Sequence, residues 1–236
     1  MVVLAGGLGT RLRALTDGLA PKVMVPINGR PFIEFKLRGL ARMGVERVVM
    51  LVGERGQQIV EHVGNGHQLD LDVTYVHDGP TLRGTAGAIR NALDHLPQHF
   101  WVTYGDTFVT GELAAAEEYA AALGATGLLC VLHNEDRWEP SNVTVLNGWV
   151  EAYRKGAPPG TFQWIDYGLL WFDRDCFTTL PEGQPVDLFE VIGQLIMRRS
   201  LAAWEVDDRF WEIGTPEAVA ATARHFDAVH LWEQLQ

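Results

Sequence analysis

The chain has 236 residues, of which 47% are hydrophobic and 21% charged, a balance typical of globular proteins with a sizeable core. Its formal net charge of −11 argues against general nucleic-acid binding, which normally needs a basic face, so any phosphate ligand should meet a local basic site. No apolar run approaches the ~18 residues of a membrane span, and no signal peptide is recognisable at the start.

The two cysteines, Cys130 and Cys176, lie in apolar runs that resemble strands, so buried thiols in a reducing cytoplasm are favoured over a disulfide. No CxxC pair is present, which argues against a structural zinc site.

In chain order, apolar and amphipathic runs alternate up to residue 133, which is the pattern of successive β-α-β units. The expected strands are rich in Val, Leu and Met without polar alternation, so both of their faces should be covered in a mostly parallel sheet. These strands span residues 2–4, 47–52, 72–76, 100–104 and 127–133, and the helices between them span 32–43, 57–62, 86–93 and 112–123.

The pattern changes after residue 134. Residues 141–146 and 149–153 flank Asn147-Gly148, a strong signal for a β-hairpin turn. A strand over 164–172 and a helix over 188–199 follow, and Thr215-Pro216-Glu217 then opens a last helix with a cap, a proline and an acidic residue. The sequence therefore predicts one α/β domain over 1–236 with a Rossmann-like, three-layer α/β/α fold around a central mixed, mostly parallel sheet. Within this domain we expect two halves, of about residues 1–133 and 134–236.

A glycine-rich loop follows the first strand directly, with the sequence Leu4-Ala5-Gly6-Gly7-Leu8-Gly9-Thr10-Arg11. Glycines allow positive φ and let backbone N–H groups approach an anion, while Thr10 adds a hydroxyl and Arg11 a planar cation suited to phosphate oxygens. The P-loop pattern fails because it ends in Gly-Lys-Ser/Thr, and the dinucleotide fingerprint fails because Leu12 replaces its third glycine. By itself the loop indicates either a phosphate site or an ordinary turn before a helix.

A second element lies downstream of this loop. Lys22 follows Pro21, eleven residues after Arg11, and the stretch LAGGLGTRL … APKVMVPINGRPFIEF resembles the signature GGxGTRL-x(n)-PK of a nucleotidyltransferase family. That family makes nucleotide-sugars from sugar 1-phosphates and NTPs. The resemblance implies that Arg11 and Lys22 grip the triphosphate and neutralise charge as pyrophosphate leaves, in a reaction catalysed mainly by positioning and charge stabilisation. A solvated surface lysine is the alternative for Lys22.

Two further segments resemble the family's nucleotide and metal sites. Gly84-Thr85-Ala86-Gly87-Ala88 resembles a G-T-x-G-A segment near the nucleobase, which implies base contacts by Gly84 and Thr85, with Asp78 as a further candidate. Simple packing at a helix start is the alternative. Gly105-Asp106 ends an apolar strand, where open α/β sheets bind ligands, and the family's Asp at this place binds Mg²⁺.

The second metal ligand is expected near the C-terminus. The segment Phe210-Trp211-Glu212-Ile213-Gly214-Thr215-Pro216-Glu217 resembles the family's F-x-D-I-G-T-P-E, with Glu212 in place of the usual Asp. Glu212 would ligate Mg²⁺ directly or through water, because hard cations prefer carboxylate oxygens. The alternatives are a turn-capping role for Asp106 and a surface salt bridge for Glu212.

The sugar side is expected in the second half of the chain. Lys155 resembles the lysine of a Glu-Lys-Pro segment that holds the sugar 1-phosphate for in-line attack, although Arg154 replaces the preceding Glu. Asn142 stands in the place of a sugar-contacting glycine, and Asp166-Tyr167-Gly168 replaces Asn-Ala-Gly. The resemblance thus assigns Asn142, Lys155, Asp166 and Gly168 to the sugar phosphate, with a local loop acceptor as the alternative for Asp166.

The resemblance extends from Val2 to about His225 and implies a Mg²⁺-dependent enzyme, with residues 1–133 binding the nucleotide and 134–236 the sugar phosphate. The GTAGAI segment and the compact length resemble heptose-1-phosphate guanylyltransferases, so GTP and a heptose or related higher sugar are the expected substrates. Two alternatives stay open: a uridylyl- or thymidylyltransferase acting on a hexose 1-phosphate, and a non-catalytic regulatory subunit that binds nucleotide-sugars. Neither a nucleic acid nor a membrane is an expected partner, and the oligomeric state is open, with a homodimer as the commonest default.

Overall fold

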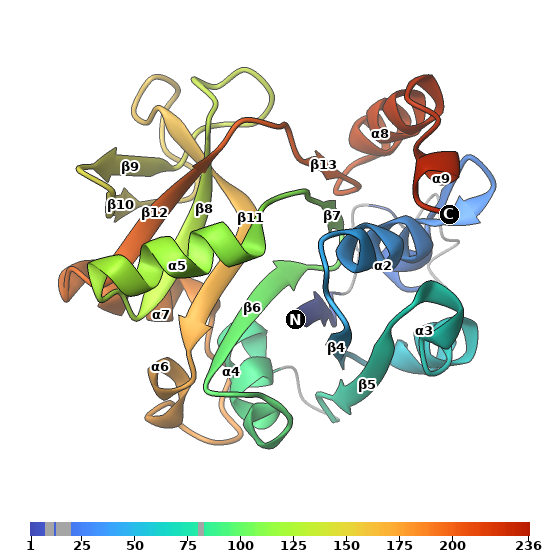
Figure 1. Cartoon of the computed structure of the whole chain (residues 1–236), viewed down its shortest axis with the longest axis horizontal. Helices are drawn as coiled ribbons and strands as arrows, with labels where there is room; N and C mark the ends of the chain where they lie inside the picture. The colour runs from blue at the N-terminus through green and yellow to red at the C-terminus, as the bar shows by residue number, and fades with distance from the viewer. Residues whose placement is uncertain (8–11, 13–19, 80–82) are drawn as a thin grey trace. The chain divides into compact units, whose positions relative to one another are not determined.

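The computed structural model describes residues 1–7, 12, 20–79 and 83–236 (Figure 1). They form two compact units. The first consists of Met1–Leu82, Thr103–Thr110 and Phe210–Gln236, and the second of Arg83–Val102 and Gly111–Arg209. The chain therefore enters the first unit three times, so the units differ from the two consecutive halves expected around residue 133.

The first unit is built on parallel strands. The central strand β4 (Arg47–Val52) pairs in parallel with β1 (Val2–Ala5) on one side and β5 (Asp72–His77) on the other. Every residue of β4 after Arg47 is buried, as expected for a parallel strand covered on both faces. The remaining elements of this unit are η2 (Lys22–Met24), β2 (Pro26–Ile27), β3 (Arg30–Pro31), α2 (Phe32–Arg42), α3 (Gly56–Val63), η3 (His67–Leu69), β7 (Thr107–Phe108), β13 (Trp211–Glu212), α8 (Pro216–Ala228) and α9 (Leu231–Gln234).

Helix α2 contributes to two hydrophobic clusters of this unit. Ile33 and Leu37 belong to a cluster with residues of β1, β4 and α3. Phe32 and Phe35 belong to a second cluster, with Phe108 of β7 and residues of α8 and α9. Because apolar side chains lie on both sides of α2, the helix is buried along most of its circumference.

The second unit has a mixed arrangement of strands. Strand β8 (Gly127–His133) pairs in parallel with β12 (Leu201–Val206) and antiparallel with β11 (Trp164–Asp173). The hairpin β9 (Val143–Leu146)–β10 (Trp149–Tyr153) is antiparallel, and β10 also pairs with β12. Figure 1 shows α5 crossing in front of β12, β8 and β11. The other elements are α4 (Gly84–Asn91), η4 (Leu93–His95), α5 (Leu113–Leu123), α6 (Asp175–Thr178), α7 (Leu188–Met197) and β6 (His99–Tyr104), whose last two residues belong to the first unit.

The expected strands and helices are all present, with ends that differ by no more than two residues. The α/β class with a mixed sheet is confirmed. In the first unit β1, β4 and β5 pair in parallel, whereas the short pairs β2–β3 and β7–β13 are antiparallel. In the second unit β8–β12 is parallel, and β9–β10 and β8–β11 are antiparallel. One placement was wrong: Cys176 lies in the short helix α6 and not in a strand. Both cysteines are free thiols, as expected. None of the described helices combines the length and hydropathy needed to cross a membrane.

Candidate active site

Three strand ends meet in the first unit, at the start of the glycine-rich loop. Gly6 and Gly53 approach so closely that a Cβ on Gly53 would lie 2.8 Å from the Gly6 carbonyl oxygen. Asp78, which is buried, donates its backbone N–H to Val52 O at 3.0 Å, and its Oδ2 would lie 3.1 Å from a Cβ on Gly6. The carboxyl ends of β1, β4 and β5 therefore bring Asp78 beside the loop, where such sheets bind ligands.

The glycine loop is described only in part. At Gly7, a Cβ would have no atom of the described residues within 4 Å. The other expected phosphate-binding residues of the loop, Gly9, Thr10 and the catalytic candidate Arg11, lie outside the described residues.

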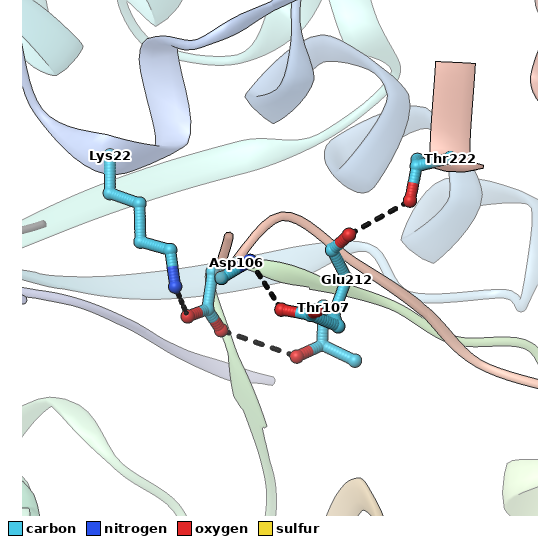
Figure 2. A network of polar contacts seen from close by, with 6 residues as sticks. Lys22, Asp106, Thr107, Glu212 and Thr222 are labelled. Atoms are coloured by element: carbon cyan, nitrogen blue, oxygen red, sulfur yellow. Dashed lines mark hydrogen bonds and ion pairs between the residues drawn. The ribbon is translucent and has the colours of Figure 1, made fainter. Parts of the chain in front are cut away.

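Asp106 lies next to the end of β1, as its position after a buried strand predicts. The Gly105 N–H donates to Leu4 O at 2.9 Å, and a Cβ on Gly105 would lie 2.9 Å from that same oxygen, so the turn requires glycine. The Asp106 carboxylate accepts a short hydrogen bond from the Lys22 ammonium and a 3.2 Å bond from the Thr107 hydroxyl (Figure 2). Because the Lys22 side chain is only 12% exposed and is paired in this way, the interpretation of it as a solvated surface lysine is wrong.

Glu212 lies on the strand that pairs with the residues after Asp106. Strand β13 is antiparallel to β7, with Glu212 opposite Thr107, and the Ile213 N–H donates to Asp106 O at 3.0 Å. The Glu212 carboxylate accepts the Gly214 N–H, and the Thr222 hydroxyl donates to Glu212 O at 2.8 Å (Figure 2). The structure therefore places Glu212 opposite the residue that follows Asp106, and the next residue, Ile213, is bonded to the Asp106 carbonyl. No group of three or more His, Cys, Asp or Glu side chains suited to a metal occurs within the described ranges.

The expected sugar-phosphate residues gather in the second unit. Strand β11 has a register irregularity between Asp166 and Leu170, and Gly168 within it has φ of 83°, a conformation that favours glycine. The Asp166 carboxylate accepts the Gly168 N–H at 2.8 Å and the Tyr153 hydroxyl at 2.9 Å. The Asp166 N–H donates to Asn142 Oδ1 at 2.9 Å, so the side chain of Asn142, the residue before β9, is bonded to β11.

The local-acceptor alternative for Asp166 is observed, and its contact with sugar hydroxyls stays a prediction. Burial raises the pKa of its carboxyl, while the Gly168 N–H, the Tyr153 hydroxyl and the charge of Lys155 act in the opposite direction. Two hydrogen-bond donors and a nearby cation thus hold one carboxylate at an irregular point of β11, an arrangement suited to polar hydroxyl ligands.

Gly84 and Thr85 have a structural role within the second unit. Gly84 has φ of 68°, and a Cβ there would lie 2.4 Å from Val186 O. The Thr85 hydroxyl accepts the Leu188 N–H at 2.7 Å, which ties the start of α4 to the start of α7. The packing alternative for this segment is therefore observed, and its role toward a nucleobase stays a prediction.

Sequence reasoning missed a buried lysine near Asp106. Lys36 in α2 is 1% exposed, and its Nζ donates to Thr103 Oγ1 at 2.7 Å. Burial lowers the pKa of Lys36 to about 7, against the attraction of the Asp106 charge, which raises it. The only local signal is the apolar flanking of Lys36 by Phe35 and Leu37, which does not distinguish a buried lysine from one at a helix surface.

Comparison with known proteins identifies the family. The family model described as "Nucleotidyl transferase" matches residues 1–142. The chain is 27% identical to a D-glycero-alpha-D-manno-heptose 1-phosphate guanylyltransferase of Campylobacter jejuni, over 92% of this chain and 95% of that protein. It is 32% identical to a mannose-1-phosphate guanylyltransferase of Mycobacterium tuberculosis, over 92% of this chain but only 61% of that protein.

A solved structure shares the fold. The crystal structure of HddC from Yersinia pseudotuberculosis superimposes with a TM-score of 0.80, at 24% identity, over 95% of this chain and 98% of that one. Together with the family match over more than half of the chain, these similarities confirm the resemblance on which the site residues were chosen. The chain therefore belongs to the nucleotidyl transferase family and, within it, to the sugar-1-phosphate nucleotidyltransferases.

Proposed function

We propose that the protein transfers a nucleotidyl group from GTP to the 1-phosphate of a heptose or a related higher sugar. The observation that carries the proposal is the Lys22–Asp106 ion pair at a strand end, beside the start of the glycine loop and paired through β7 and β13 with Glu212. The Campylobacter relative is named as a heptose 1-phosphate guanylyltransferase and aligns over nearly its whole length. This supports GTP and a heptose 1-phosphate over other combinations of nucleotide and sugar phosphate.

The proposed reaction is a displacement at phosphorus. An oxygen of the sugar 1-phosphate attacks the α-phosphorus of the NTP, a new P–O bond forms, and the bond from the α-phosphorus to the β-phosphate oxygen breaks. Pyrophosphate leaves with that electron pair, and an NDP-sugar remains. Catalysis of such transfers consists mainly of alignment and charge stabilisation, and this chain offers Lys22 and, outside the described residues, Arg11 for the triphosphate.

The proposal assigns a magnesium site to the carboxylates of Asp106 and Glu212. Mg²⁺ is usually held by one or two protein carboxylates together with substrate phosphates and water, so two acidic residues are a sufficient protein contribution. Glu212 lies opposite Thr107, the residue that follows Asp106. Mg²⁺ bound there would offset negative charge on the phosphate oxygens. Lys22 positions the Asp106 carboxylate by direct contact.

The remaining site residues are assigned by the same proposal. In the first unit, the described nucleotide-binding residues are Leu4, Ala5, Gly6, Gly7, Asp78 and Gly105, and in the second unit Gly84 and Thr85 contact the base. Lys155 binds the sugar phosphate, and Asn142, Asp166 and Gly168 bind the sugar. The hydrogen bonds that orient the Asp166 carboxylate support its use as an acceptor for sugar hydroxyls. The cytoplasmic location and the homodimer stay predictions.

The test is an assay of pyrophosphate release that combines five NTPs with a panel of sugar 1-phosphates. Turnover with GTP and a heptose 1-phosphate, and thermal stabilisation by GTP with Mg²⁺, are the expected results. Stabilisation and turnover with UTP or dTTP alone would instead establish the alternative, which relatives named as glucose-1-phosphate uridylyl- and thymidylyltransferases support. Stabilisation by an NDP-sugar without turnover by any pair would establish a regulatory subunit.

The metal assignment makes a separate prediction. Asp106→Asn is expected to lower kcat about 100-fold or more, because removing one preorganised charge from such a site has an effect of that order. Asp207→Asn is the matched control, since it makes the same change at an exposed aspartate outside the proposed site. Pyrophosphate release by both variants is measured at saturating substrates. Normal release by Asp106→Asn would show that this carboxylate is not a metal ligand.

A further inference from the structure

Lys36 is a buried cation that the proposed reaction does not use. Its side chain, with 1% of its surface exposed, extends from α2 to Thr103, which is fully buried in β6, and the Nζ–Oγ1 distance is 2.7 Å. A lysine ammonium has three N–H donors. Among the described residues, the Thr103 hydroxyl accepts a hydrogen bond from the Lys36 ammonium. Burying a charge with so little compensation is costly, so such a group is a candidate for a functional role.

Helix α2 contacts the chain on both sides of Asp106. Lys36 is bonded to Thr103, three residues before Asp106. One turn further along α2, Gly39 is packed so closely that a Cβ there would lie 2.7 Å from Cε2 of Phe108, two residues after Asp106. The helix therefore holds the strand end before Asp106 and the strand after it. Because both contacts lie within a few residues of the carboxylate, a shift at either one moves Asp106.

Asp106 is also electrostatically linked to this helix. The carboxylate contacts the Lys22 ammonium directly, and its charge raises the pKa of Lys36 against the lowering effect of burial. The two lysines differ in setting: Lys22 is partly exposed and bonded to the carboxylate, whereas Lys36 is buried and bonded to the Thr103 hydroxyl.

We propose that Lys36 is a positioning residue for Asp106: its amino group, anchored on Thr103, fixes the end of β6 three residues before the carboxylate. The inference rests on the proposed function, in which Asp106 is a metal ligand of the nucleotidyl transfer. Lys36 itself contacts neither substrate in this proposal. Its effect is expected in the rate of the transfer and not in the binding of either substrate.

The first experiment removes the charge and its acceptor together. Lys36→Met with Thr103→Val keeps the approximate shapes while removing both polar groups, a change that is often nearly neutral for stability. The double variant is therefore expected to unfold at the temperature of the wild type or above it. With its best substrates, its kcat should fall about tenfold or more while KM changes less than about twofold, the pattern of an interaction that acts in the transition state.

Thr103→Ser is the matched control, because it keeps the acceptor oxygen for Lys36 and removes only a methyl group. It is expected to retain kcat within about twofold of the wild type. A folded double variant with unchanged kcat would overturn the proposal, as would a Thr103→Ser variant that loses as much kcat as the double variant.

The second experiment does not depend on catalysis. The chain contains only three lysines, Lys22, Lys36 and Lys155, so NMR of protein labelled with ¹³C-lysine gives three Cε signals that single substitutions assign. At neutral pH, Asp106→Asn is expected to move the Lys36 signal toward that of a neutral amine, because a carboxylate favours the charged ammonium. The Lys155 signal serves as the internal control and should stay in place.

These outcomes separate the two proposals. If the wild type turns over no pair of substrates, the proposed function fails, and the NMR comparison still decides whether Lys36 and Asp106 are coupled. If the wild type is active but the Lys36 signal is the same with and without the Asp106 carboxylate, the positioning role fails while the proposed function stands.

Discussion

Two lysine ammonium groups lie near the end of β6, but in different environments. Lys22 forms an ion pair with Asp106 near the surface, and Lys36 is held in the core by the hydroxyl of Thr103. Lys22 and Asp106 were each predicted as site residues because both occur in segments that resemble family signatures, but their pairing was not predicted. Lys36 belongs to no such segment and became apparent only from its burial.

The burial of Lys36 predicts how stability depends on pH. Its pKa falls from 10.5 to about 7 in the folded protein, so the unfolded chain binds more protons throughout this window. The free energy of unfolding should therefore rise with pH from about 7 to about 10, by up to about 1.4 kcal/mol per pH unit. Below pH 7 the buried ammonium is charged and its full cost is present.

Urea unfolding of the wild type and Lys36→Met at two pH values isolates this contribution, since other titrating groups are common to both proteins. Between pH 7 and pH 9 the wild type is expected to gain about 2 kcal/mol relative to the variant. An unchanged difference between the two proteins would mean that Lys36 titrates as it does in water.

Among the helices, α2 and α7 each contain an interior glycine, but with different surroundings. Gly39 in α2 faces the ring of Phe108 at a distance that leaves no room for a Cβ, whereas a Cβ on Gly193 in α7 would meet nothing within 4 Å. The close approach at Gly39 lets α2 lie against β7, the strand that follows Asp106. The same residue type therefore has a packing role in one helix and none in the other.

Alanine substitutions at these two glycines should change stability in opposite directions. Gly193→Ala is expected to stabilise the protein by about 0.5–1 kcal/mol, because alanine loses less conformational entropy in a helix. Gly39→Ala is expected to destabilise it by about 1–3 kcal/mol through overpacking, and to lower kcat by displacing β7. Chemical denaturation and pyrophosphate release measure both effects. If Gly39→Ala proved as stable as Gly193→Ala, the tight contact with Phe108 would be wrong.

Turn and helix-capping motifs of a few residues predicted the secondary structure correctly. Asn147 and Gly148 adopt φ of 51° and 81°, as a two-residue hairpin turn requires, and β9 and β10 pair across them. Thr215 caps α8 with its hydroxyl on the Ala218 N–H at 3.2 Å, also as predicted. Cys176 was misplaced because the apolar run ends at Phe172; the charged residues that follow end the strand, and Asp175–Thr178 forms a one-turn helix.

For the molecule as a whole, the net charge of −11 makes a prediction about partners. Binding to a nucleic-acid backbone depends on many cationic contacts, and two basic residues of the first unit, Lys22 and Arg30, are already in ion pairs with Asp106 and Glu34. Fluorescence anisotropy with a labelled DNA duplex at low salt should therefore show no association at micromolar protein. A salt-sensitive rise in anisotropy would contradict this and indicate a basic surface that the composition conceals.

The sequence by itself determined the α/β class, the positions of the helices and strands, and the family, because these depend on short-range periodicity and on motifs of contiguous residues. Only the tertiary structure decided which distant residues meet: Lys22 with Asp106, Thr107 with Glu212, and Lys36 with Thr103. It also decided that the chain enters the first unit three times, which no division at a single residue describes. The physical reason is that contacts between segments far apart in the chain depend on strand order and helix packing, which local residue preferences do not encode.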